Sequence, residues 1–209
     1  MLQAENMGAL AVNCLVAVGS NLPSPTGSIA QSVTVALELL ADIESVEIVA
    51  QSRFYETPAY PAGSGPDFIN AAIEISTDLS PEELLKNLHN VEEQMGRVRG
   101  TRWAARLLDL DLLTYGTSVL PDVETFTHWL EMPEKRHSVE APEQLILPHP
   151  RMQSRGFVLV PLAEIAADWR HPELGLTVRQ MLDNLPPDVL IGIRPLGPQV
   201  AGPTGVRGK

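Results

Sequence analysis

Four arginines, a tryptophan and two aspartates are gathered in the stretch GRVRGTRWAARLLDLDLLTY, residues 96–115. Asp109 and Asp111 lie two residues apart in its leucine-rich half. In a β-strand, residues i and i+2 point to the same face, so the two carboxylates share one face and the neighbouring leucines occupy the other. Ionised carboxylates held side by side repel each other, and divalent cations relieve this repulsion. The pattern predicts a metal site on a strand, and its hard oxygen ligands favour two Mg²⁺ ions.

The arginines before this strand suit a phosphate group. Four of them fall within ten residues: Arg97, Arg99, Arg102 and Arg106. The planar guanidinium matches phosphate oxygens bidentately, so carboxylates for metal and arginines for phosphate favour phosphoryl or pyrophosphoryl transfer. The alternative is a half-exposed strand whose aspartates pair with nearby arginines. The sequence has no G-x-x-x-x-G-K-S/T motif, which argues against a P-loop kinase.

Length and composition predict one globular domain. The 209 residues are 44% hydrophobic and carry a net charge of −11, which argues against a general nucleic-acid or anionic-membrane surface. The single cysteine, Cys14, cannot form an internal disulfide, and no segment resembles a signal peptide or membrane span, so we expect a cytoplasmic protein. We expect a flexible leader over 1–13, one domain over 14–194, and a disordered Gly/Pro-rich tail over 195–209.

Hydrophobic spacing then supplies the elements that would position the charged residues. Strands are predicted for 14–21, for a segment from Val46 towards 52–60, for 68–77, and from about residue 107 or 108 onwards. Helices are predicted for 28–42, for 81–95 with Ser80 as N-cap and Gly96 beyond the C-terminus, and for 156–169 and 177–185. Residues 116–147 form a long insertion with a possible short helix near 126–130. The β-α-β-β-α-β order indicates a ferredoxin-like α+β fold, an antiparallel-rich sheet with helices packed on it in α-β-α layers.

Five motifs in one order resemble a known enzyme family. They are VGSN, FYETP, DFINAA, GRVR followed by RW and RLLDLDLL, and LPHPRMQSRGFVLVPLAEIAA. Together they resemble the 6-hydroxymethyl-7,8-dihydropterin pyrophosphokinases of folate biosynthesis, from about Leu15 to Asn184. The resemblance implies Mg²⁺-dependent transfer of diphosphate from ATP to the hydroxymethyl group of the pterin, with release of AMP. It implies small-molecule substrates, no nucleic acid or membrane partner, and a monomer or weak dimer.

The resemblance also assigns roles to individual residues. Asp109 and Asp111 would hold the metal ions, and Arg97 and Arg106 would be catalytic. The implied pterin-binding residues are Thr57, Pro58, Phe68, Asn70, Trp103 and Phe157. The implied ATP-binding residues are Arg99, Arg102, Leu112, His149, Arg151 and Arg155. Taken without the family, Phe68 and Phe157 could equally be core residues, His149 a turn residue between prolines, and Glu92 a surface carboxylate or an orienter of an arginine.

One departure from the family pattern keeps two alternatives open. Ala104 and Ala105 stand where the family usually has Gly-Pro, a change that alters loop stiffness. A degenerate member that binds ATP or pterin without turnover is one alternative. A non-enzymatic interaction domain in which the 116–147 insertion matters most is the other. Both aspartates and both key arginines are kept, which favours the enzyme.

Overall fold

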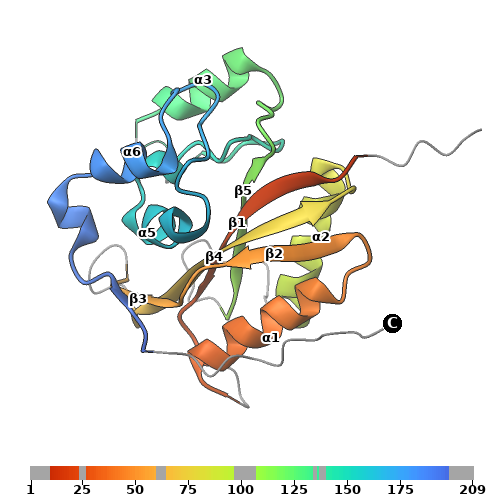
Figure 1. Ribbon diagram of the computed structural model, residues 1–209, viewed down its shortest axis with the longest axis vertical. Coiled ribbons are helices and arrows are strands. Elements are labelled where there is room, and N and C mark those ends of the chain that lie inside the picture. Colours follow the sequence, from red (N-terminus) through yellow and green to blue (C-terminus); the bar gives the residue numbers. More distant parts are fainter. Residues whose placement is uncertain are drawn as a thin grey trace, which may run out of the picture.

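A computed structural model describes residues 10–23, 27–59, 65–96, 107–133, 136 and 140–197. Figure 1 shows a central sheet with helices on both of its faces, as the sequence predicted. Most of the expected leader and tail lies outside the described residues. Where the ends are described, the first strand begins at Val12, and Arg194–Pro195 form a short edge strand. No helix in these described ranges is both long and apolar enough to cross a membrane.

The sheet is antiparallel throughout its described pairings. Its order is β5-β1-β4-β3-β6, and β2 also pairs with β4. The strands are β1 (Val12–Ser20), β2 (Val46–Gln51), β3 (Tyr55–Thr57), β4 (Phe68–Thr77), β5 (Asp109–Tyr115) and β6 (Arg194–Pro195). The chain keeps the predicted β-α-β-β-α-β order, with β3 as a separate piece between β2 and β4. This order places β5, which carries the two aspartates, at one edge of the sheet.

The segment after Val46 is two strands because its regular pairing with β4 ends at Gln51 and resumes only at Tyr55. The Ser52 amide donates to the Ala72 carbonyl at 2.9 Å, and the Ser52 hydroxyl accepts from the Ala72 amide at 2.9 Å. A side chain thus takes the place of a backbone partner, which ends β2 and lets β3 start again at Tyr55 along the same edge of β4.

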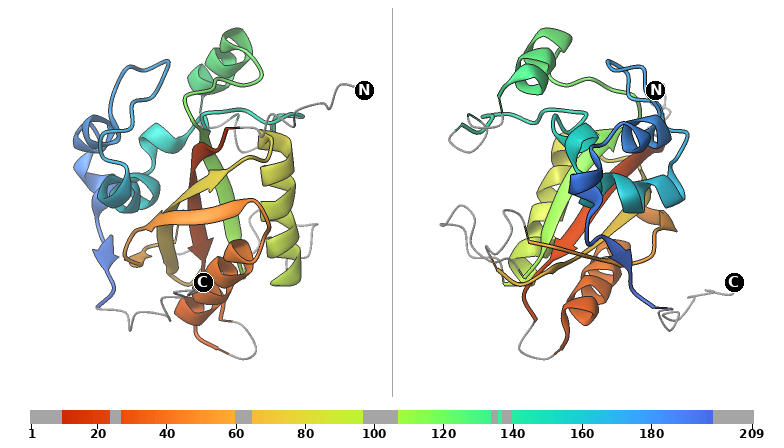
Figure 2. Two further views of the ribbon diagram at one scale, coloured as in Figure 1. Left: turned by 45° about the vertical axis from the view of Figure 1, so that its right-hand side comes forward. Right: turned by 90° about the vertical axis from the view of Figure 1, so that its left-hand side faces the viewer.

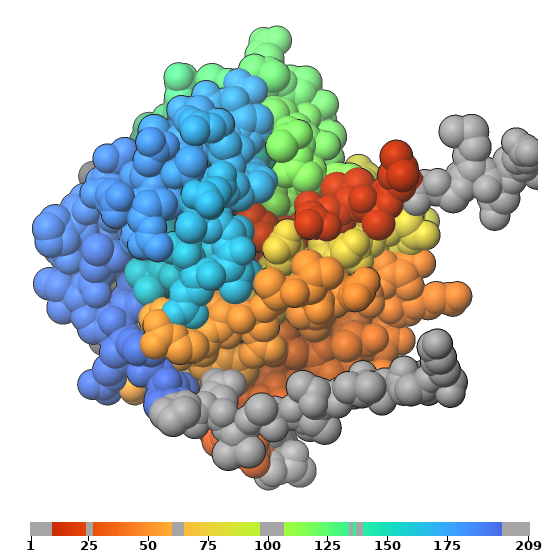
Figure 3. All heavy atoms as spheres, in the orientation of Figure 1, coloured from red at the N-terminus to blue at the C-terminus, as the bar shows by residue number. Residues whose placement is uncertain are grey.

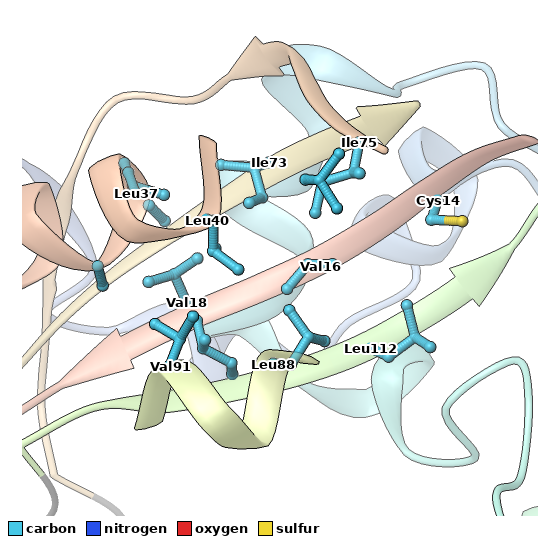
Figure 4. Packing of buried hydrophobic residues seen from close by; sticks show 14 of the residues in the cluster. Cys14, Val16, Val18, Leu37, Leu40, Ile73, Ile75, Leu88, Val91 and Leu112 are labelled. Atoms are coloured by element: carbon cyan, nitrogen blue, oxygen red, sulfur yellow. The ribbon is translucent and has the colours of Figure 1, made fainter. Parts of the chain in front are cut away.

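Helices α1 (Ile29–Ala41) and α2 (Pro81–Gln94) cover one face of the sheet. Figure 4 shows Leu37 and Leu40 of α1 and Leu88 and Val91 of α2 meeting the strand residues. The strand members of this core come from alternate positions and include Cys14, Val16, Val18, Ile73, Ile75 and Leu112. The helices predicted for 28–42 and 81–95 from hydrophobic spacing thus pack with their apolar residues on the sheet. Burial raises the pKa of the Cys14 thiol to about 12, so it behaves as a small apolar side chain.

Helices α5 (Gly156–Ile165) and α6 (Val178–Asp183) lie on the opposite side of the sheet from α1 and α2, as the two views in Figure 2 show. They pack with the short 3₁₀ helix Met152–Ser154 on the strand residues of the second face, among them Leu15, Ala72 and Leu113. Leu113 lies on this second face because it alternates with Leu112, which faces α2, so the two leucines are buried on opposite faces. The pairing of β5 with β1 is irregular at this point: Leu15 pairs with Thr114, but Val16 pairs with Leu112.

Local capping signals confirm the predicted start and end of α2. The Ser80 hydroxyl accepts from the Glu83 amide at 3.3 Å, and the Glu83 carboxylate accepts from the Ser80 amide at 3.0 Å. Gly96 follows with φ of +94°, a left-handed conformation that favours glycine. The same reciprocal cap occurs at Ser28 for α1 and at Thr177 for α6. These bonds satisfy amides that the first helical turn leaves without partners.

The insertion after β5 contains a real helix, α3 (Val123–Glu131), longer than the short helix expected near 126–130. Its Phe126 is fully buried, with its ring 5.6 Å from that of His171. Figure 3 shows the green insertion and the blue C-terminal region in contact across this surface. The Trp169 ring lies 5.8 Å from the His171 ring. An aromatic cluster of Phe126, His171 and Trp169 thus anchors the insertion to the domain.

Burial of His171 is expected to make the free energy of unfolding fall at acid pH. Desolvation lowers its pKa to about 4 from 6.5, and its Nδ1 accepts amide hydrogens from Glu173 and Leu174 at 3.2 Å. Because the folded-state pKa is depressed, the unfolded chain binds the proton first, and stability falls as pH drops below about 6.5. We expect His171→Asn, which keeps an acceptor near Nδ1 but cannot titrate, to lose less stability than wild type between pH 7 and 5, by about 2 kcal/mol. Urea unfolding of both proteins at the two pH values measures this, and equal pH dependence would contradict it.

Candidate active site

Asp109 and Asp111 occupy the predicted face of β5. Leu108, Leu110 and Leu112 are at most 4% exposed beneath α2, whereas the Asp111 side chain on the opposite face is 37% exposed. On the neighbouring strand, Gly19 pairs with Asp109 and Ala17 with Asp111. Glycine and alanine leave room beside the carboxylates. The shared orientation predicted from the two-residue spacing is confirmed.

Gly19 of β1, which pairs with Asp109 on one side, pairs on its other side with Asn70 of β4. A Cβ atom on Gly19 would lie 2.8 Å from Asn70 Oδ1, so a larger residue would push the amide away. Asn70 Nδ2 donates to Thr57 Oγ1 at 2.7 Å, and both side chains are buried. The hydroxyl of Thr57 therefore fixes the rotation of the amide. Asp109, Gly19 and Asn70 form a continuous row across β5, β1 and β4.

The other residues implied in pterin binding differ in how deeply they are buried and in where they lie relative to Asn70. Phe68 shares its strand face and is only partly buried; its Cδ1 lies 4.0 Å from the position of a Gly19 Cβ. Phe157, in the first turn of α5, is a partly buried member of the cluster on the same face of the sheet. Neither phenylalanine is an enclosed core residue. Pro58 is exposed and lies against Gly192, where a Cβ would be 2.6 Å from Pro58 Cγ.

Arg155 connects the aromatic residues to the carboxylates. Its Nη1 lies 3.5 Å from Asp111 Oδ2, and its guanidinium carbon is 5.5 Å from the centre of the Phe157 ring. As the residue before α5, it projects from the helix start towards β5. The ion pair is long at 3.5 Å, and it places a positive charge beside the Asp111 carboxylate. This position suits a group that would contact phosphate held at the aspartates.

His149 is held beside the same carboxylates by the backbone. Its amide donates to the Leu113 carbonyl at 2.7 Å, and its Nδ1 accepts from the Arg151 amide at 3.1 Å. Desolvation, reinforced by the positive charges of Arg155 and Arg151 and opposed by Asp111, lowers the pKa of His149 to about 4. His149 is therefore neutral at pH 7, and because Nδ1 is an acceptor, Nε2 carries the hydrogen. The structure thus places His149 in a turn, with its imidazole close to Asp111.

Glu92 is buried, which excludes the interpretation of a surface carboxylate. It is 1% exposed, and its Oε1 accepts from the Leu110 amide at 2.9 Å on the outer edge of β5. Sequence reasoning left its role open. The signal was its position on α2, four residues after Leu88 and beside Val91, where a carboxylate interrupts the apolar stripe. Glu92 thus provides the hydrogen-bond acceptor for an amide on the outer edge of β5, at the start of the DLD segment.

A cleft of about 430 Å³ opens along the outer edge of β5. Its lining includes Asp109, Asp111 and Arg151, together with the imidazole of His149. His89 of α2 lies along its side, and the insertion contributes Trp129 and the segment 140–146. The insertion residues were not among the residues predicted for the site, because nothing in their local pattern indicates where the helix packs.

The donor set fits magnesium. In the described part of the chain, no group of three or more His, Cys, Asp or Glu side chains is arranged to hold a metal ion. Two aspartates on one strand face are therefore the candidate protein ligands. Mg²⁺ commonly takes one or two carboxylates and completes its shell with water and substrate phosphate oxygens. Five predicted site residues, Arg97, Arg99, Arg102, Trp103 and Arg106, together with Ala104 and Ala105, lie outside the described residues.

The sequence model of the 7,8-dihydro-6-hydroxymethylpterin-pyrophosphokinase (HPPK) family matches residues 15–167. The chain belongs to this family. The HPPK match includes both aspartates and continues through α5, and it contains the whole insertion with α3.

Two curated HPPK proteins illustrate the similarity. The chain is 34% identical over 171 residues to the 2-amino-4-hydroxy-6-hydroxymethyldihydropteridine pyrophosphokinase of Synechocystis, covering 82% of this chain and 75% of that one. It is 36% identical over 173 residues to the enzyme of the same name from Methylorubrum extorquens, covering 81% and 91%.

The solved HPPK-DHPS protein of Plasmodium falciparum has a similar fold, with a TM-score of 0.59 at 14% identity. The match covers 83% of this chain but only 44% of that longer chain. At this identity the likeness supports the ferredoxin-like α+β architecture alone.

Proposed function

We infer that this protein transfers diphosphate from ATP to the hydroxymethyl group of 6-hydroxymethyl-7,8-dihydropterin, releasing AMP, as a step of folate biosynthesis. The observation that carries this inference is the row of Asp109, Gly19 and Asn70 across three strands. Strands lie about 4.8 Å apart, so the carboxylates and the amide are separated by roughly 10 Å. That separation suits a bicyclic ring recognised at one end whose substituent reaches the metal-binding end.

Asn70 and Thr57 would bind the polar edge of the pterin. With Nδ2 engaged by Thr57, the fixed amide can present a defined acceptor and donor pattern to an amide-like ring edge. Phe68 and Phe157, both partly exposed, would cover the flat faces of the ring. Pro58, and Trp103 from the loop before β5, are proposed by family resemblance to complete this pocket.

ATP would occupy the cleft along β5 with its phosphates near the two aspartates. Asp109 and Asp111 would hold two Mg²⁺ ions, which when bound neutralise phosphate charge and make the pterin hydroxyl easier to deprotonate. Arg155, Arg151 and the Nε2–H of neutral His149 would bind phosphate oxygens. The backbone of Leu112, on the outer edge of β5, would contact the nucleotide. Arg99 and Arg102 are assigned to ATP by resemblance.

The transfer forms a bond from the hydroxymethyl oxygen to the β-phosphorus and breaks the bond from that phosphorus to the α–β bridging oxygen. The hydroxyl proton leaves to solvent, and AMP departs with the bridging oxygen. Arg97 and Arg106, by family resemblance, would stabilise the negative charge that moves onto AMP. Neutral His149 can donate a hydrogen bond to the phosphates but does not add positive charge at pH 7.

The decisive experiment follows both products in one reaction. Purified protein with ATP, Mg²⁺ and the hydroxymethyl pterin is expected to form AMP and the pterin diphosphate in equal amounts, measured by chromatography and mass spectrometry. Omitting the pterin should abolish AMP formation. ATP and pterin binding without either product would support the non-catalytic alternative. Absence of binding of both would instead support an interaction domain.

A further inference from the structure

Trp129 of the insertion lines the same cleft as Asp109 and Asp111. It comes from α3, a helix whose placement depends on contacts distant from the carboxylates. Figure 2 shows α3, in green, beyond one end of the sheet, with the chain that follows it returning towards β5. The insertion is therefore part of the wall of the proposed ATP site.

Several contacts fix α3 in this position. Asp122 caps the helix by accepting from the Thr125 amide at 2.8 Å. Phe126 is fully buried against His171. Leu120 and Leu147 exchange backbone hydrogen bonds of 2.8 and 3.1 Å, which tie the two ends of the insertion together. Trp129 follows Phe126 by three residues, so the two side chains lie on adjacent parts of one helix face. The buried anchor thus orients the indole towards the cleft.

Charged residues are distributed unevenly around the cleft. Arg151 and the polar His149 line the cleft together with Asp109 and Asp111, and Arg155 lies beside Asp111. The insertion contributes Trp129, Leu145 and Ile146 to the lining, with Glu143 and with Glu140, which is ion-paired with Arg136. A triphosphate is attracted by the arginines and by metal ions and repelled by Glu143. An uncharged flat base is therefore directed to the side of the cleft that the insertion supplies, with its indole and aliphatic side chains.

The outer edge of β5 presents polar backbone to the same cleft. The Leu110 amide is bound by Glu92, and the Leu113 carbonyl by the His149 amide. In an antiparallel strand the groups of alternate residues point to the same edge, so those of Leu112 also point outward, between the two bonded positions. A base hydrogen-bonded there would lie with its face accessible to a side chain from the opposite wall of the cleft.

We propose that Trp129 stacks on the nucleobase of ATP, so that the insertion supplies a nucleotide-binding residue to the active site. The proposal rests on the proposed function, which places ATP in this cleft. Stacking of a base on an aromatic side chain accounts for roughly 10- to 100-fold in affinity. The contribution of stacking to affinity should appear only for ligands that have a base, because the indole is not among the groups proposed to bind phosphate.

The test compares a ligand that has the base with one that lacks it. Isothermal titration calorimetry with Mg²⁺ gives the Kd of α,β-methylene-ATP, whose scissile linkage cannot break, and of inorganic tripolyphosphate. Trp129→Leu is expected to weaken binding of α,β-methylene-ATP about 10-fold or more and to leave tripolyphosphate binding unchanged. Trp129→Phe should retain most of the affinity. Val123→Ala, on the exposed side of the same helix, should match wild type.

The outcomes separate this proposal from the assignment of the reaction. An unchanged Kd for α,β-methylene-ATP in Trp129→Leu would overturn the stacking role, as would an equal loss for both ligands, which would indicate a displaced cleft. If wild type binds α,β-methylene-ATP but forms no AMP from ATP and the pterin, the proposed reaction is wrong. In that case the Trp129 comparison still decides whether the indole stacks on the base. If wild type does not bind α,β-methylene-ATP at all, both are overturned.

Discussion

Asp111→Asn is expected to lower the rate of AMP formation by a factor of about 1,000 or more at saturating ATP and pterin, because it removes a metal-binding charge from the reacting end of the site. Asparagine keeps the size of the side chain and its place on the surface of β5. The side chain is partly exposed, and its ion pair with Arg155 is long at 3.5 Å, so loss of that ion pair should change the free energy of unfolding by less than about 1 kcal/mol. Activity would thus be lost from a folded protein.

Two measurements distinguish metal binding from a general disturbance. The Mg²⁺ concentration needed for half-maximal activity should rise in Asp111→Asn, and the Kd of the pterin alone should stay close to that of wild type. Asp183→Asn, an exposed aspartate at the end of α6, changes the net charge equally and should retain wild-type activity. If Asp111→Asn kept more than about a tenth of the activity at the same Mg²⁺ concentration, Asp111 would not be an essential metal ligand.

Asn70→Leu is expected to raise the Kd of the pterin about 10- to 100-fold, because a ring edge desolvated without its hydrogen-bond partner costs about 1–3 kcal/mol. Leucine is similar in size and leaves the strand intact. The Kd of α,β-methylene-ATP should not change, since Asn70 lies on β4, two strands away from β5. Fluorescence titration of the pterin and calorimetry of the nucleotide provide the two values.

Two companion variants test whether the rotation of the Asn70 amide matters. Thr57→Val removes the hydroxyl that accepts from Asn70 Nδ2 and should weaken pterin binding by a smaller factor than Asn70→Leu. Gly19→Ala places a methyl group 2.8 Å from the present position of Asn70 Oδ1 and should also weaken it, although it removes no polar atom. Pterin binding that is unaffected by all three changes would exclude this row as the pterin site.

Local rules account for the elements that were predicted well. The shared face of Asp109 and Asp111 follows from the two-residue period of a strand, which holds wherever the strand lies. The limits of α2 follow from the Ser80–Glu83 capping box and from Gly96, whose interactions span only a few residues. Boundaries that depend on distant partners were less accurate. The division into β2 and β3 depends on hydrogen bonds between Ser52 and Ala72, twenty residues later.

The sequence by itself determined the chemistry of this protein: two aligned carboxylates, arginines near them, and an amide beside Phe68 on one strand face. These follow from residue types and from short periods along the chain. Only the tertiary structure decided which of these features meet. It set Gly19 between Asp109 and Asn70, buried Glu92 at the edge of β5, and placed Trp129 in the cleft. Strand order and helix docking arise from the packing of apolar surfaces far apart in the chain, and no local period encodes that packing.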